Sequence, residues 1–150
     1  MRIGVDSSVL VAALHANHPI HAVATGWMIS AMRKHELVVG SHSVLECYAV
    51  LTRLPGKWRI SSEEALQLLR ETVAANMTIA DTPLKTAWDF LDSISVKNVT
   101  GGQAYDAWVI HALNSAKADR IATFNPAHFT SIAGKLEVFD PSTSVSSGQP

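Results

Sequence analysis

Three carboxylic acids and one amide lie beside short apolar segments of this sequence, at positions where folding could bring them together. Asp6 directly follows an apolar stretch, and Asn125 follows another, while Glu46 and Asp106 each lie near the start of a predicted helix. Carboxylates gathered in an apolar setting repel one another unless a cation neutralises them. Oxygen-only ligands suit Mg²⁺ or Mn²⁺ better than zinc. Taken together, the four residues predict a divalent-metal site.

Each of these residues also has a purely structural interpretation. Asp6 could cap the helix that follows it, and Asn125 could cap a turn beginning at a proline. Glu46 lies three residues after Ser43, which is the spacing of a capping box. Asp106 lies in a first helical turn, where the helix dipole favours a carboxylate. For any single residue this structural interpretation is the more probable one.

Two observations favour the metal site when the residues are considered jointly. Asp106 shares a helical face with apolar residues three, four and seven positions later, namely Val109, Ile110 and Leu113. Glu46 is embedded in the apolar run 44–51. Because carboxylates are rarely buried without a partner or a metal, both acids are expected to serve more than a capping role.

Alternating apolar strands and helices must position these residues. The predicted strands are 2–5, 37–40, 77–80, 120–123 and 136–139, and the predicted helices are 9–14, 20–34, 43–54, 61–75, 82–94 and 104–118. Such alternation predicts an α/β fold of three layers, with a central parallel sheet flanked by helices. Ligands of such sheets bind at the carboxyl ends of the strands, and the four polar residues fall at that edge.

The composition narrows the class of protein. The chain has 150 residues, 47% of them hydrophobic and 17% charged, with a net charge of -1 and a single cysteine. These values exclude intrinsic disorder, nucleic-acid binding by bulk charge alone, and a cysteine-rich zinc site. No apolar run approaches a membrane span, and Asp6 interrupts any signal-peptide core, so a cytoplasmic protein is expected. One domain is expected over residues 1–140, followed by a flexible tail over 141–150 that is rich in Ser and Pro.

Four motifs occur in an order that makes a family resemblance specific. They are Val5–Leu10, Gly40–Glu46 with Val50–Pro55, Tyr105–Ala107, and Ala122–Asn125 with His128 and Phe129. Any one of them is weak evidence, but the ordered set spans residue 3 to about 140. In this set the sequence resembles PIN-domain proteins, and more narrowly the VapC-type toxin ribonucleases of bacterial toxin–antitoxin pairs.

The resemblance implies roles for individual residues. Asp6, Glu46 and Asp106 correspond to the family's acidic metal ligands, and Ser7 and Thr123 match nearby hydroxyl positions. Asn125 stands where many members carry a fourth aspartate, so one negative charge is missing there. Asp119 is not expected to substitute, because it precedes its strand and should lie at the opposite edge. One well-occupied metal position is therefore expected, with no tightly held second ion.

The resemblance also implies an activity and partners. The expected reaction is hydrolysis of RNA phosphodiester bonds by a Mg²⁺- or Mn²⁺-dependent endoribonuclease, which leaves a 5′-phosphate and a 3′-hydroxyl. A cognate antitoxin that blocks the site and a homodimer are expected as well. One alternative is a non-catalytic module that binds RNA or protein. A phosphatase is disfavoured, because the sequence after Asp6 lacks a second aspartate two residues on.

Two further clusters allow more than one interpretation. Arg53, Lys57, Trp58 and Arg59 place three cations and an aromatic ring in one loop. This loop could contact RNA through phosphates and a stacked base, or it could be solvated, or Trp58 could pack at a protein interface. The three histidines at positions 15, 18 and 21 could bind zinc or nickel, although a solvated loop is favoured because Pro19 interrupts the helix.

Overall fold

A five-stranded parallel sheet forms the centre of the molecule. The computed structural model describes residues 1–145, and its strands are β1 (Arg2–Val5), β2 (Glu36–Gly40), β3 (Thr78–Ala80), β4 (Arg120–Ala122) and β5 (Glu137–Phe139). Their order in the sheet is β3-β2-β1-β4-β5, and every neighbouring pair is parallel. The predicted central parallel sheet is confirmed. β1 lies in the middle, so the residue that follows it stands at the centre of the carboxyl edge.

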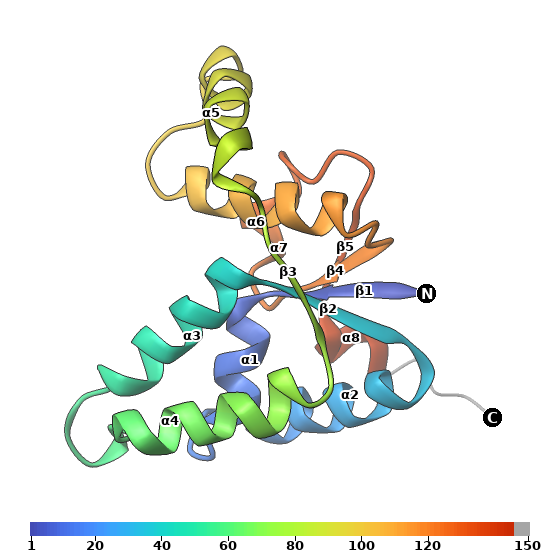
Figure 1. Cartoon of the computed structure of the whole chain (residues 1–150). Coiled ribbons are helices and arrows are strands. Elements are labelled where there is room, and N and C mark those ends of the chain that lie inside the picture. The colour runs from blue at the N-terminus through green and yellow to red at the C-terminus, as the bar shows by residue number, and fades with distance from the viewer. Residues whose placement is uncertain (146–150) are drawn as a thin grey trace.

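Helices cover both faces of the sheet, which gives the three layers expected (Figure 1). The helices are α1 (Ser7–Leu14), α2 (His21–Lys34), α3 (Ser41–Thr52), α4 (Ser62–Leu69), α5 (Ala87–Val96), α6 (Gln103–Ser115), α7 (Pro126–Phe129) and α8 (Pro141–Val145). One layer holds α1 to α4 with α8, and the other holds α5 to α7. Within residues 1–145 no helix is long and apolar enough to cross a membrane.

The alternation of side chains along β2 divides the interior into two cores. Leu37 and Val39 pack with α1, α2 and α3, whereas Val38 between them packs with α6. This is the period of two that a strand buried on both faces requires. The two cores therefore lie on opposite faces of the sheet.

A close approach of helix to strand sets the position of α6. A Cβ atom added to Gly4 in β1 would lie 2.5 Å from a methyl carbon of Leu113, which is itself fully buried. The absence of a side chain at Gly4 leaves room for the Leu113 methyl groups against β1. Asp106 lies seven residues before Leu113 and so shares its face of the helix. The face of α6 that carries Asp106 is therefore the face that packs on the sheet.

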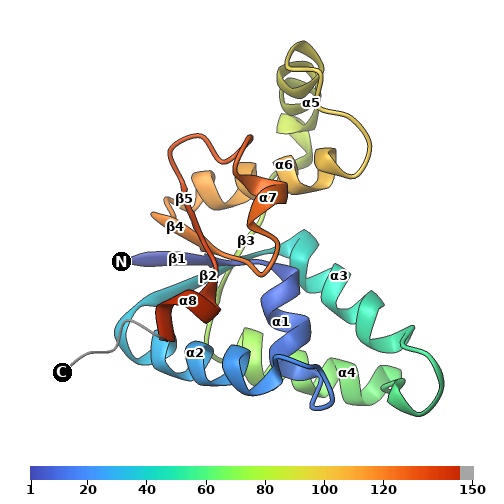
Figure 2. The same ribbon diagram turned by 180° about the vertical axis from the view of Figure 1, so that it is seen from behind.

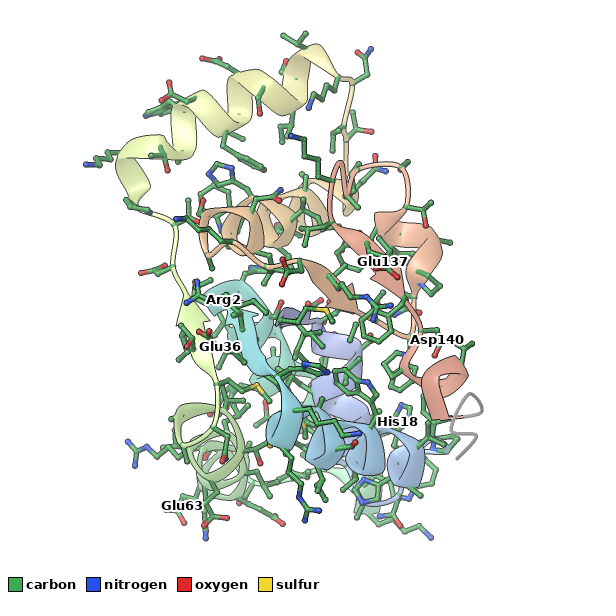
Figure 3. All side chains as sticks on the ribbon, turned by 90° about the vertical axis from the view of Figure 1, so that its right-hand side faces the viewer. Arg2, His18, Glu36, Glu63, Glu137 and Asp140 are labelled. Carbon is green, nitrogen blue, oxygen red and sulfur yellow. The ribbon has the colours of Figure 1, made fainter. Side chains whose placement is uncertain are left out.

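The amino edge of the sheet carries its own paired charges. Arg2 Nε donates to Glu36 Oε2 at 2.8 Å, and the two residues lie together in Figure 3, which views this edge. The backbone N–H of Arg2 donates to Asp119 Oδ2, also at 2.8 Å. Asp119 thus lies at the edge opposite to Asp6, as its position before β4 predicted.

Several predicted boundaries are wrong. Helix α1 begins at Ser7 rather than residue 9, and α3 begins at Ser41 rather than residue 43. The predicted helix from residue 82 begins as a 3₁₀ turn at Leu84–Thr86 and becomes α-helical only at Ala87. The helix predicted from residue 61 is capped by Ser61, whose Oγ accepts from the Glu64 N–H at 3.1 Å. That helix continues through a π-helical turn at Arg70–Ala74.

The predicted flexible tail is also wrong in its first five residues. Residues 141–145 form α8, which packs against α2 (Figure 2). Asp140 begins this helix, because its Oδ1 accepts from both the N–H and the hydroxyl of Ser142. Pro141 is buried at the start of α8. A composition rich in Ser and Pro therefore did not indicate this short capped helix. The rest of the predicted tail, residues 146–150, lies outside the described part.

Candidate active site

Asp6 stands at the carboxyl end of the central strand and caps α1. Its side chain is 5% exposed and accepts from the Ser8 N–H at 3.3 Å, so the capping interpretation is correct. Capping accounts for only part of its bonding, because two hydroxyl groups also donate to the same oxygen. Ser8 Oγ lies 2.7 Å from Asp6 Oδ2, and Thr123 Oγ1 lies 2.9 Å from it. The carboxylate is therefore held in one orientation.

The two hydroxyl groups also fix the end of β4 against the start of α1. The Phe124 N–H donates to Ser8 Oγ, and the Asn125 N–H donates to Thr123 Oγ1, each at 3.0 Å. Thr123 is completely buried. Thr123 was predicted to lie near the site but Ser8 was not, and the predicted Ser7 places its Oγ 3.4 Å from Asp6 Oδ1. A hydroxyl two residues after a helix-capping aspartate was the available signal for Ser8.

Asp106 occupies the first turn of α6 with its side chain 27% exposed. Burial raises the pKa of its carboxyl group above the usual range, and the charges of Asp6 and Glu46 raise it further. Two histidines act in the opposite direction and lower this pKa. His128 Nδ1 lies 3.7 Å from Asp106 Oδ2, and His42 acts through its charge. Asp106 is thus within electrostatic reach of both other acids, at an edge where negative charge is not fully neutralised.

Glu46 differs from expectation in its surroundings. It lies on α3 and is exposed, as is the neighbouring Leu45, so the apolar run around it does not indicate burial. The capping-box alternative is also wrong, because α3 begins at Ser41 and Ser43 lies buried inside the helix.

Cys47, the residue after Glu46, is buried. Burial, together with the Glu46 charge, raises the pKa of its thiol to about 12. At neutral pH that thiol stays protonated and is a core residue rather than a nucleophile.

Asn125 precedes α7 without capping it through its side chain. It is exposed and occupies the N-cap position, yet its side chain makes no capping hydrogen bond. Its backbone is held by Thr123, whose hydroxyl also contacts Asp6. The Asn125 backbone therefore belongs to the same hydrogen-bonded unit as the Asp6 carboxylate.

Asn125→Asp should raise the affinity or stoichiometry of Mn²⁺ binding, because it adds a carboxylate beside a buried one. Calorimetric titration measures both quantities directly. Asn114→Asp is a matched control, since Asn114 is exposed near the end of α6, whereas Asp106 lies near its start. If neither quantity differs from wild type, Asn125 takes no part in a metal site.

The donor chemistry of this edge fits a hard divalent cation. Asp6, Asp106 and Glu46 offer only oxygen atoms, and the charges of Asp6 and Glu46 add to the effect of burial in raising the Asp106 pKa. As they stand, no group of three or more His, Cys, Asp or Glu side chains in residues 1–145 is close enough to hold an ion. Asp6 and Asp106 are more buried than Glu46, which is exposed on α3.

The three histidines near the start of the chain lie apart from this edge. His15 is buried, and its ring meets that of His18 edge-on at 6.3 Å between centroids. His21 Nδ1 lies 3.0 Å from the Ala12 carbonyl oxygen. Burial lowers the pKa of His18, and the neighbouring His15 and His21 lower it further. These side chains pack between α1 and α2.

The cationic loop lies far from the carboxylates. It joins α3 to α4 through a short 3₁₀ turn at Gly56–Trp58, at the end of α3 remote from the sheet (Figure 1). Trp58 is 47% exposed, and Arg59 Nε donates to the Leu54 carbonyl oxygen at 3.2 Å. Arg53 lies seven positions after Glu46 along α3, a rise of about 10 Å at about 1.5 Å per residue. The loop and the acidic edge are separate features of one side of the molecule.

Comparisons with known proteins agree with this arrangement. A family model of the PIN domain matches residues 3–135. Ribonuclease VapC27 of Mycobacterium tuberculosis is 31% identical over 117 residues, which are 78% of this chain and 80% of the relative.

Two solved structures share the fold at lower identity. The crystal structure of Mycobacterium tuberculosis VapC20, described as a sarcin-ricin loop cleaving toxin, aligns with a TM-score of 0.68 at 16% identity. It covers 91% of this chain and 98% of its own. VapBC2 from Rickettsia felis, solved with a DNA fragment from its promoter, aligns with a TM-score of 0.66 at 15% identity, over 93% and 98% of the two chains. With its parallel sheet, its acidic edge and these relatives, the chain belongs to the PIN-domain family.

Proposed function

We propose that this protein is a divalent-metal-dependent endoribonuclease and the toxin of a VapBC-type pair. The observation that carries the proposal is the placement of the acids: Asp6 is held by two hydroxyl groups at the end of the central strand, and Asp106, in the first turn of α6, is near enough to feel the charges of Asp6 and Glu46. Repelling carboxylates at the carboxyl edge of a parallel sheet are suited to a cation that binds a phosphate group. The relative VapC27, named a ribonuclease, supports RNA as the substrate.

The chain's own residues would bind and orient the reactants. Asp6 and Asp106 would hold the metal, with Glu46 joining them from α3, while Ser8 and Thr123 keep the Asp6 carboxylate in a fixed orientation. When bound, Mg²⁺ or Mn²⁺ supplies Lewis acidity that activates water and stabilises charge on the phosphate oxygens. The exposed amide of Asn125 is available to orient water or phosphate.

In the proposed reaction a water oxygen bonds to phosphorus and the bond from phosphorus to the 3′ oxygen breaks. The attacking water gives up a proton and the leaving 3′ oxygen takes one up, so the products are a 5′-phosphate and a 3′-hydroxyl. Incubation of total RNA with the protein, with Mn²⁺, Mg²⁺ or EDTA, tests the proposal when combined with end-group analysis. Cleavage that requires metal and leaves these ends is expected, whereas cyclic phosphate ends or activity in EDTA would contradict it.

A non-catalytic RNA- or protein-binding module is the second candidate. It is favoured by the neutral Asn125 and by the spacing of the acids, which do not converge to a preformed group within the described residues. RNA binding without cleavage at any metal concentration would identify this alternative.

The proposed partners are a cognate antitoxin and a second copy of the chain. The structural relative from Rickettsia felis is a VapBC2 assembly, which supports an antitoxin partner. An antitoxin that inhibits cleavage would have to cover the edge that carries Asp6 and Asp106.

Arg53, Lys57, Trp58 and Arg59 are proposed as a secondary RNA contact. Replacing Lys57 and Arg59 with alanine should weaken RNA binding and flatten its salt dependence, because each phosphate contact adds about -0.7 to the log–log slope for single strands. Trp58→Ala should cost about 1–3 kcal/mol if the ring stacks on a base. Binding titrations at several salt concentrations measure both effects, and metal affinity should not change.

The control for this loop is the pair Lys34 and Lys117, whose side chains border the amino edge of the sheet. Replacing both with alanine removes the same charge without touching the loop. An equal loss of RNA affinity in the two double variants would show a general charge effect and exclude a specific contact. If Trp58→Ala leaves RNA affinity unchanged and lowers the molecular mass of the protein in solution, the ring belongs to a protein interface.

A further inference from the structure

A small apolar pocket lies at the start of α6, the helix that carries Asp106. Its volume is about 290 Å³, and it lies between α5, α6 and the start of α3. Four rings line it, those of His42, Phe90, Tyr105 and Trp108, together with Leu91 and two alanines. Tyr105 directly precedes Asp106, and the charge of His42 lowers the Asp106 pKa. Two pocket-lining residues, Ala104 and Tyr105, therefore share the first turn of α6 with Asp106.

Two of these rings already form a parallel stack. The ring planes of His42 and Tyr105 are inclined by only 3°, with centroids 5.1 Å apart. Tyr105 is 63% exposed even so, which leaves much of its surface available to another flat group. The other two rings of the pocket, Phe90 and Trp108, contact each other edge-to-face, with their centroids 4.7 Å apart. The stack spans two helices, since His42 comes from α3 and Tyr105 from α6.

We propose that this pocket is a stacking subsite for one base of a single-stranded RNA, next to the phosphate held at Asp106. This inference rests on the proposed nuclease function and specifies how its substrate is held. Proteins hold unpaired RNA bases chiefly by stacking them on Phe, Tyr, Trp or His, because every base has an aromatic face. A base stacked on Tyr105 would fix the adjoining phosphate beside the carboxylates.

The size and lining of the pocket favour a base over a protein segment. Its volume is at the lower end of the range of about 300–1,000 Å³ for small-molecule sites, which suits a single ring system. A docked amphipathic helix needs a groove long enough for anchors over two turns. The described lining holds no acidic side chain, while Asp106 follows Tyr105 on the same helix, which suits a ligand with an apolar ring joined to a cation-bridged phosphate.

Fluorescence anisotropy with short single-stranded oligouridylate and oligoadenylate tests the subsite, in EDTA so that metal-dependent cleavage is prevented. Tyr105→Ala should weaken binding by about 5- to 150-fold, the range found when a stacked aromatic ring is removed. Tyr105→Phe keeps the ring and should bind as wild type does. Trp88→Ala is the matched control, because Trp88 is an even more exposed ring on α5 that does not line the pocket. It should also bind as wild type does.

An abasic sugar–phosphate strand of equal length separates stacking from charge. Its binding should be the same for wild type and Tyr105→Ala, and an equal loss on both strands would overturn the subsite. Unchanged RNA affinity combined with a lower molecular mass in solution would assign Tyr105 to an interface between protein chains, and would also overturn it. Cleavage by wild type in Mn²⁺ is measured separately. If wild type cleaves RNA and Tyr105→Ala binds RNA as tightly as wild type, only the subsite is refuted. If Tyr105→Ala weakens RNA binding but wild type does not cleave, only the nuclease function is refuted.

Discussion

Asp106→Asn should reduce RNA cleavage by at least about 100-fold while the fold persists. Loss of a residue that only orients a metal ligand typically costs about 10–100-fold, and loss of a ligand itself should cost more. Asp106 is the better of the two central acids to replace, because its side chain is 27% exposed and accepts no hydrogen bond from buried hydroxyl groups in the described structure. Initial rates on a labelled RNA measure the effect.

Asp119→Asn provides the matched control for that variant. It makes the same change at the amino edge, where Asp119 accepts from the Arg2 N–H. It should cleave RNA at the wild-type rate. If both variants lost activity equally, or if Asp106→Asn stayed active, Asp106 would not be a metal ligand. Asp6→Asn should also be inactive, although it loses stability as well because Asp6 Oδ2 accepts from two hydroxyl groups.

The pKa of Asp106 leads to a separate expectation for stability without metal. Its pKa is raised in the folded state above the value of about 3.9 for an unfolded chain. Between these two values the folded protein binds more protons than the unfolded protein, so stability falls as pH rises through the window. The contribution of protonated Asp106 to the stability of the folded state is fully present only below the pKa that Asp106 has in the unfolded chain.

Asp106→Asn should remove this fall in stability. In EDTA at neutral pH the variant should therefore melt at a temperature at least as high as wild type. Added Mn²⁺ should raise the melting temperature of wild type but not of the variant. Equal metal-induced stabilisation of the two proteins would contradict the assignment, as would a variant whose stability falls with pH as steeply as that of wild type.

The architecture could be predicted because periodicity and burial agree along most of the chain. Each strand of the central sheet is short, apolar and followed by a helix, and a strand buried on both faces has few alternatives. Val38 and its neighbours show the result, since adjacent residues enter different cores. Once the strands are known to be parallel, the residues that follow them must meet at one edge. That reasoning applies to Asp6 and Asn125, which follow the segments of β1 and β4, whereas their role as a site stays a prediction.

The surroundings of individual side chains could not be predicted in the same way. Glu46 lies in an apolar run, yet it is exposed, because α3 buries only part of its surface and leaves Leu45 exposed too. Local sequence does not reveal which stripe of a helix faces the core when nearly all of its residues are apolar. The stack of His42 on Tyr105 depends on how two helices distant in sequence approach each other. No spacing rule contains that information.

Thr123→Val should destabilise the protein by about 1–3 kcal/mol and reduce cleavage by about 10–100-fold. Valine has nearly the same shape, so the buried site is not left with a cavity. The change removes the donor to Asp6 Oδ2 and leaves the Asn125 N–H without its acceptor. Chemical denaturation and initial cleavage rates measure the two effects. Thr52→Val is the control, because Thr52 Oγ1 bonds only within α3, to the Tyr48 and Ala49 carbonyl oxygens.

A double-mutant cycle with Ser8→Ala decides whether the two hydroxyl groups act as one unit. Ser8 Oγ and Thr123 Oγ1 contact the same oxygen of Asp6 and lie 3.3 Å from each other. Residues that share a partner in this way typically show coupling energies of about 0.5–3 kcal/mol, whereas independent residues are additive. We expect coupling in both stability and cleavage, because either hydroxyl alone leaves the carboxylate free to turn. Additive effects on cleavage would mean that Asp6 is held by capping alone and that the hydroxyl groups serve only the fold.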